Sequence, residues 1–138
     1  MKKITVVLFL LFIFLAKANA ANWIEISSDE NTTYLIDSSS IKSYPNRIVK
    51  LWMKAIFKNP QKIDYSQKEY NSLLSLIKYN SPDDSIMYIQ RASYLDLAIV
   101  DSATAKNPSY SEIIPDSIGD LIKETVCYKE SNKKMLIK

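Results

Sequence analysis

The sequence predicts an α+β fold in which an antiparallel sheet of about six strands packs one face against a C-terminal helix. Short segments before residue 110 alternate apolar and polar side chains, which is the period of a half-buried strand. Residues 113–128 follow the helical period instead. Because the strands come first and the helix last, the chain is expected to form a meander with the helix laid across it.

The predicted helix carries one apolar stripe. Pro115 prevents a helix from continuing in from upstream, and Asp116 or Ser117 can cap the first free N–H groups, so the helix should start near residue 116. Ser117 and Asp120 are spaced like a weak capping box. We expect the stripe to be buried against the sheet, and its apolar members are Ile118, Leu121, Ile122 and Val126.

The segment from Arg47 to Phe57 is the strongest predicted strand. Its odd-numbered positions from Val49 to Phe57 are apolar, whereas the even-numbered positions mix isoleucine, lysine and tryptophan. One face should therefore lie in the core and the other should be amphipathic, so this strand is expected to be central. Further strands are predicted at about 23–27, 33–37, 72–79, 85–95 and 98–103, with a short pairing at 110–114 and a loop at 59–70.

The first twenty residues predict a signal peptide. Lys2 and Lys3 precede an apolar run of about 13 residues, shorter than the roughly 20 needed to span a bilayer, and Ala18 and Ala20 fit the −3 and −1 positions of a cleavage site. We expect cleavage after Ala20, export to the periplasm, the medium or the cell surface, and no membrane span afterwards. Residues 21–128 then form a single domain, and 129–138 a basic polar tail.

The charge balance does not favour a nucleic-acid partner. The leader holds three of the 18 basic residues and none of the 15 acidic ones, which leaves 15 of each sign beyond residue 20. No basic stripe interleaved with aromatic residues follows.

Catalytic chemistry is poorly supported. The chain has no His and one Gly, so His-dependent bases, metal sites and Gly-rich phosphate loops are not expected, and neither is a cofactor. Turns that need a positive φ must use Asn or Asp. A carboxylate pair acting on cell-wall material remains an alternative, with the members Asp37, Asp64, Glu69, Asp83, Asp84, Asp96 and Asp101.

Two features are candidates for interaction. Trp52 lies between Lys50 and Lys54 on the amphipathic face of the central strand, where a large aromatic side chain could contact another protein. Cys127 is the only cysteine, and it could be an inert thiol, an intermolecular disulfide or a reactive group.

The chain resembles the surface-adhesin protein E family over nearly its whole exported part. The resemblance is carried by Trp23 near the start, by residues 33–37 with Ser40-Ile41, by the strand 48–54, by residues 114–118, and by a helix ending in Cys127. It implies an exported protein with an antiparallel sheet and a C-terminal helix, from a family whose namesake is an adhesin that binds host matrix proteins and can dimerise.

Two departures accompany this resemblance. The family usually joins the Cys at the helix end to a second Cys, and the matching position here is Ser81. The lipid anchor of the namesake is absent as well. The resemblance implies a non-catalytic protein that binds an envelope or host-matrix protein, and the alternative is a structural or accessory envelope protein acting as a homodimer through a sheet edge or Cys127.

Overall fold

The computed structural model describes residues 20–135, with side chains through Cys127. The predicted signal peptide lies outside the described residues, apart from Ala20. The described chain contains eight strands, one short 3₁₀ turn (η1) and one α-helix. In order these are β1 Trp23–Ser28, β2 Thr32–Asp37, β3 Lys42–Tyr44, η1 Pro45–Arg47, β4 Ile48–Lys62, β5 Glu69–Asn80, β6 Ser85–Leu95, β7 Ala98–Thr104, β8 Ser111–Glu112 and α2 Ile118–Met135.

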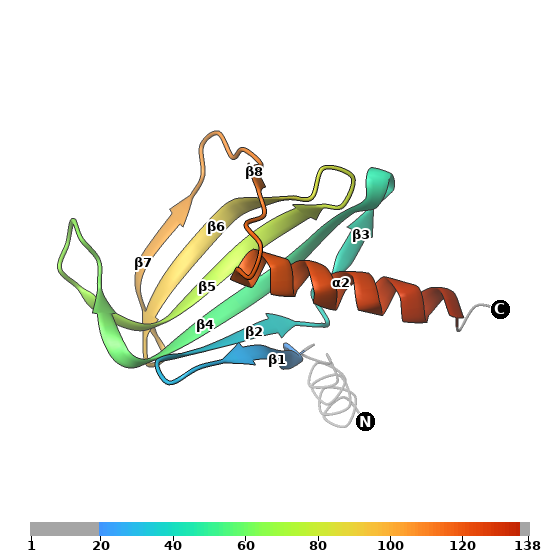
Figure 1. Cartoon of the computed structure of the whole chain (residues 1–138). Helices are drawn as coiled ribbons and strands as arrows, with labels where there is room; N and C mark the ends of the chain where they lie inside the picture. The colour runs from blue at the N-terminus through green and yellow to red at the C-terminus, as the bar shows by residue number, and fades with distance from the viewer. Residues whose placement is uncertain (1–19, 136–138) are drawn as a thin grey trace, which may run out of the picture.

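The strands form one antiparallel sheet, and α2 crosses one of its faces (Figure 1). The main order is β1-β2-β4-β5-β6-β7, while β3 pairs with β4 and β8 pairs with β6. We call the face covered by α2 the inner face and the opposite one the outer face. The predicted α+β class, with a helix on one face of an antiparallel sheet, is confirmed.

Alternation along β4 sorts its side chains between the two faces. Val49, Leu51, Met53 and Ala55 are buried, while the residues between them from Ile48 to Lys54 are half-buried. β4 pairs with β2 and β5 on its two edges, so it is an interior strand, as the sequence predicts.

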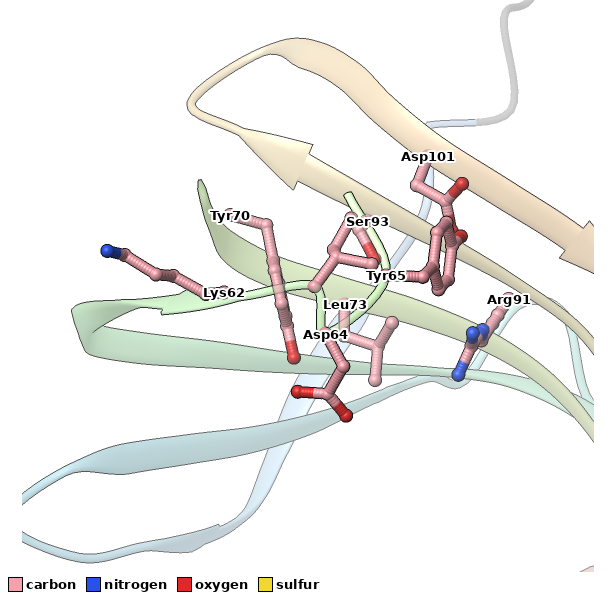
Figure 2. Close-up of a pocket in the computed structure, with 9 residues that line it drawn as sticks. Lys62, Asp64, Tyr65, Tyr70, Leu73, Arg91, Ser93 and Asp101 are labelled. Carbon is pink, nitrogen blue, oxygen red and sulfur yellow. The ribbon is translucent and has the colours of Figure 1, made fainter. Parts of the chain in front are cut away.

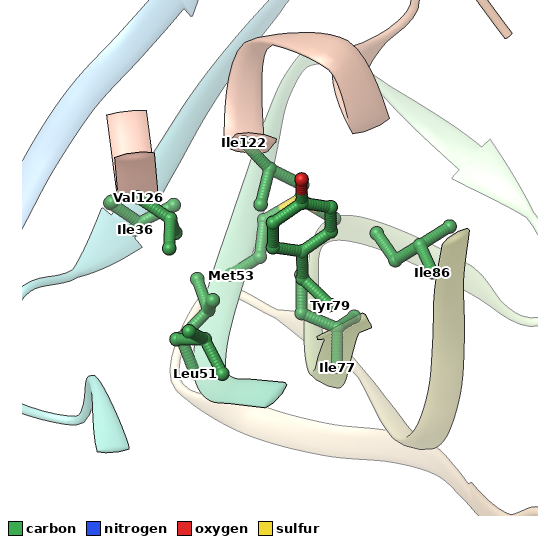
Figure 3. Close-up of a cluster of buried hydrophobic side chains, with 9 residues drawn as sticks. Ile36, Leu51, Met53, Ile77, Tyr79, Ile86, Ile122 and Val126 are labelled. Carbon is green, nitrogen blue, oxygen red and sulfur yellow. The ribbon is translucent and has the colours of Figure 1, made fainter. Parts of the chain in front are cut away.

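The core lies between α2 and the inner face. Ile122 and Val126 are almost fully buried, and Figure 3 shows them above side chains of β2, β4, β5 and β6. Ile118 and Leu121, the other two members of the predicted stripe, are only half-buried. Burying a side chain of this size stabilises a fold by about 1.5–3 kcal/mol, so the predicted apolar stripe is what attaches the helix. The sheet members of this cluster are Ile36, Val49, Leu51, Met53, Ile77, Tyr79 and Ile86.

The helix boundaries differ from the prediction. The helix begins at Ile118 rather than near 116, because Asp116 has a φ of 59° and its N–H donates to the Asp120 carboxylate at 3.3 Å. Asp120 therefore caps the turn before the helix, one residue earlier than in the expected capping box. The helix also continues past residue 128 to Met135, so most of the segment predicted as a tail is helical.

The predicted loop at 59–70 is wrong for half of its length, because only 63–68 lie outside the strands. β4 continues to Lys62 and β5 starts at Glu69, because pairing resumes at Gln61 with Tyr70 after an irregularity that follows Ile56. Pro60 lies inside this irregular stretch, where it is not required to donate a ladder hydrogen bond. β3 was not predicted, because three exposed residues carry no period.

Positive φ angles fall mainly on Asn and Asp, as expected for a chain with one Gly. Asn46, Asp84, Asp96 and Asp116 adopt them, together with Arg47 and Gln67. The turn at Asp84 places that carboxylate close to α2, as described below.

Candidate interaction surfaces

The predicted group Lys50, Trp52 and Lys54 lies on the outer face of β4, with all three side chains half-buried. The Trp52 backbone N–H donates to Ser40 Oγ at 2.9 Å, which fixes the segment after β2 against β4. Lys54 Nζ lies 4.4 Å from the ring centroid of Trp23 on β1, a cation–π contact. Contacts with neighbouring segments therefore hold Trp52 and Lys54 in place, and Trp23 adds a second aromatic ring next to them.

Strand register adds two lysines that the sequence did not single out. Lys42 on β3 pairs with Lys50 on β4, and Lys50 pairs with Lys78 on β5. Directly paired residues project from the same face, so Lys42, Lys50 and Lys78 form a row of three cations across the outer face. Among the described residues, none of the three forms an ion pair. We call the set formed by these three lysines and Trp52 the basic row.

Cys127 lies on α2 with an exposed side chain. Its thiol is close enough to Tyr79 to influence that hydroxyl, and Tyr79 also interacts with the Ser81 side chain. Cys127 and Ser81 therefore approach the same tyrosine from two different elements. This is where the family resemblance would place a disulfide.

Tyr79 is buried to 2% exposure, and its pKa is raised to about 12, chiefly by burial and also by the Asp84 carboxylate, to which its hydroxyl donates at 3.1 Å. Asp84 in turn forms an ion pair with Lys123 on α2. The pKa of Asp84 is lowered, chiefly by this lysine. The three groups join the β5–β6 turn to the helix.

The candidate carboxylates are spread over the fold. Asp37 is buried and accepts hydrogen bonds from the N–H of Asn22 at 2.9 Å and of Ser39 at 3.0 Å. Burial acts to raise the pKa of Asp37. The hydrogen bonds from these two N–H groups, from the Ser39 side chain and from the Ser40 backbone outweigh burial, so the pKa is lowered. Asp37 is thus a structural cap between β1 and the segment after β2.

Two other members of the list, Asp64 and Asp101, line one cavity of about 160 Å³ on the inner face. In Figure 2 the Asp64 carboxylate points away from Asp101, and the Tyr65 ring stands beside Asp101. A hydrogen bond to Asp101 raises the pKa of Tyr65, while the nearby Arg91 guanidinium acts in the opposite direction. The structure thus brings Tyr65, Arg91 and Asp101 together, and sequence reasoning did not connect them.

Neither a metal site nor a spanning helix is found in the described part of the chain. Within residues 20–127, no three His, Cys, Asp or Glu side chains gather as a metal ion would require. Over residues 20–135, no helix has both the length and the apolar character needed to cross a bilayer.

The protein is a curved antiparallel sheet with a helix on its inner face and half-buried lysine and tryptophan side chains on its outer face. The family model described as surface-adhesin protein E matches residues 23–128, which is most of the chain. The chain belongs to the surface-adhesin protein E family, and it is an adhesin-like protein. Membership in a family of surface adhesins indicates an exported or cell-surface protein. A search of curated proteins gave no match.

Proposed function

We propose that this chain is a non-catalytic, exported binding protein whose outer face attaches to an acidic surface of a partner protein. The observation that carries the proposal is the basic row, in which three lysines on adjacent strands are paired in register. The partner is an envelope or host-matrix protein, reached from the periplasm, the medium or the cell surface.

The basic row costs stability in the free protein. Like charges directly opposite one another on adjacent strands are destabilising by a few tenths of a kcal/mol or more. A carboxylate surface placed over the row would turn that repulsion into attraction, and it would speed association at low salt. The row therefore supports an acidic partner rather than a purely apolar one.

Trp52 gives the same face an anchor. Tryptophan is enriched among the residues that dominate binding energy, and truncating such a residue typically costs 2 kcal/mol or more, on the order of thirtyfold in Kd. Trp52 is half-buried in the first half of β4, so part of its side chain is accessible on the outer face. On β5, Leu76 pairs with Trp52 and Leu74 pairs with Lys54, so both leucines extend the apolar part of the outer face.

The test is a pull-down with the exported chain as bait, against envelope extract and against purified matrix proteins. Trp52→Ala and Lys50→Gln should each weaken capture of the same partner by about tenfold or more. Lys106→Gln is the matched control, because Lys106 is exposed in the β7–β8 connection and lies outside the basic row. Capture that is unchanged in both outer-face variants would remove the proposal.

A second candidate function, a structural or accessory envelope protein acting as a homodimer, is supported by the exposed thiol of Cys127. A disulfide between two copies would join their helices and leave both outer faces free. Nonreducing electrophoresis of the exported chain tests it, with Cys127→Ser as the control. A monomer alone under oxidising conditions would exclude the disulfide-linked form.

The carboxylate-enzyme alternative receives less support. Asp64 and Asp101 share a cavity, but Asp101 is engaged by Tyr65. We propose that neither carboxylate acts on a bond. Asp64→Asn and Asp101→Asn should leave partner capture by the outer face unchanged.

A further inference from the structure

The inner face is only partly covered by α2. The buried helix residues contact the cluster around Leu51, Ile77 and Ile86, near the β5–β6 turn. Towards the other end of these strands the inner face is open, and Figure 1 shows no helix over it. Two adjoining cavities lie there, of about 160 and 390 Å³, and both are lined by Leu73 and Arg91.

Arg91 stands between small neighbours on this open part of the inner face. It pairs with Ser75 on β5 and with Ala103 on β7, so the strands on both sides place short side chains next to it. Ser75 is 2% exposed and forms part of the floor of the larger cavity. The hollow beside Arg91 follows from this pairing of one long side chain with two short ones.

The Arg91 side chain interacts with Tyr65. A guanidinium carries five N–H donors, so this one contact leaves other donors for a ligand. Within the part of the chain whose side chains are described, no carboxylate lies at ion-pair distance from the Arg91 guanidinium. Asp101, which lines the same smaller cavity, is engaged by the Tyr65 hydroxyl. A planar guanidinium of this kind matches a carboxylate with two parallel hydrogen bonds.

The walls next to Arg91 are mostly apolar. The larger cavity is lined by Leu73, Tyr88, Ile89 and Ala103 besides Arg91 itself. Its volume of about 390 Å³ falls in the range of about 300–1,000 Å³ found for small-ligand sites. The extra residue that β6 carries between Tyr88 and Gln90 turns Tyr88 to the inner face, opposite Ile77. The hollow thus combines one cation with an apolar lining.

We propose that this inner-face cavity binds a carboxylate carried on a short apolar body, with the carboxylate on Arg91 and the apolar part against Leu73 and Tyr88. The carboxylate belongs either to a free aliphatic acid or to the C-terminal residue of a peptide. The site lies on the face opposite the basic row, so it does not depend on the proposed function.

The experiment is an NMR titration of the ¹⁵N-labelled exported chain with octanoate and, separately, with octanol. Octanoate should bind at least about tenfold more tightly than octanol, and it should shift the amide resonances of Leu73, Ser75, Arg91 and Ala103. Arg91→Gln should abolish the difference between the two ligands. Arg47→Gln is the matched control, because Arg47 is the only other arginine and lies in η1.

N-acetyl-leucine and its amide distinguish the two sources of the carboxylate. Preference for the acid over the amide assigns the site to peptide C-termini, whereas binding of octanoate alone assigns it to aliphatic acids, and either result supports the proposal. Equal binding of octanoate and octanol would overturn it. So would shifts confined to the outer face, or an Arg91→Gln variant that keeps the preference while its spectrum shows an intact fold.

Discussion

The Lys123 ammonium on the first turns of α2 is paired with the Asp84 carboxylate in the β5–β6 turn, and the two residues lie 39 positions apart in the chain. Asp84 also accepts the hydrogen bond of the buried Tyr79 hydroxyl. One turn carboxylate therefore connects a core tyrosine to the helix that covers the core. This contact fixes the position of α2 along the sheet, in addition to the apolar contacts of Ile122 and Val126.

Removing this ion pair should loosen the helix slightly. We expect Lys123→Met to lower the Tm by at most about 5 °C, because the pair is exposed to solvent. The pKa of Asp84 is lower in the folded protein than in the unfolded chain, where it is about 3.9. The ion pair therefore stabilises the fold above that pH, and this stabilisation is lost as the pH falls through the pKa of Asp84 in the folded protein. Thermal melts of the variant and of Lys106→Met, at neutral pH and at a series of lower pH values, check whether the Lys123→Met defect shrinks as the pH falls. A Lys123→Met defect that persists at the lowest of these pH values would contradict the assignment.

Alkaline pH should destabilise the protein through Tyr79. Its pKa is raised from 10.0 to about 12, so the stability it contributes is complete below pH 10 and is lost as pH rises towards 12. This rise in the pKa corresponds to roughly 3 kcal/mol in the free energy of unfolding. Urea unfolding from pH 9 to 12 should show a steeper loss in wild type than in Tyr79→Phe, which keeps the ring but cannot ionise. Parallel loss in both proteins would show that other groups are responsible.

A cysteine at position 81 should form an internal disulfide with Cys127. Both positions interact with Tyr79, and this is the bridge that the family resemblance implies. Closing the chain between these positions should raise the free energy of unfolding by about 4 kcal/mol in the chain-entropy model. Oxidised and reduced Ser81→Cys can be compared by urea unfolding and by mass spectrometry of peptides. An oxidised variant that runs only as a disulfide-linked dimer would contradict the proximity of the two positions.

The single glycine is not required by the helix. A Cβ added at Gly119 would lie 3.4 Å from Ser117 Oγ and 3.5 Å from the Ile113 side chain, which are ordinary contacts. Because alanine restricts the unfolded chain and favours helix, Gly119→Ala should raise the free energy of unfolding by about 0.5–1 kcal/mol. Gly119→Val is the matched comparison, since its two extra methyl groups should cancel the gain. A destabilised alanine variant would mean that the first turn needs glycine after all.

The elements with a strong period could be predicted from sequence. The apolar stripe of α2 and the alternation along β4 are local patterns, and the structure buries Val49 and Leu51 as predicted, together with Ile122 and Val126, two of the four stripe residues. β3 could not be found this way, because its stability comes from pairing with β4 rather than from its own three residues.

The sites depend on information that a single strand does not carry. Lys42, Lys50 and Lys78 become neighbours only through the register of three strands, and hairpin register depends on loop length and on irregularities such as the one after Ile56. Arg91 and Tyr88 share the inner face because β6 has an extra residue between them, which simple alternation would not predict. Trp52 between two lysines could be singled out, because that group lies within one strand.

Lysine acetylation footprinting, read by mass spectrometry, tests most directly whether the outer face contacts the partner. With the captured partner bound, the acetylation rates of Lys42, Lys50 and Lys78 should fall several-fold, because the basic row would lie in the interface. Lys106, exposed in the β7–β8 connection, should react at an unchanged rate. Unchanged rates at the three lysines of the basic row, with the partner bound, would contradict the account.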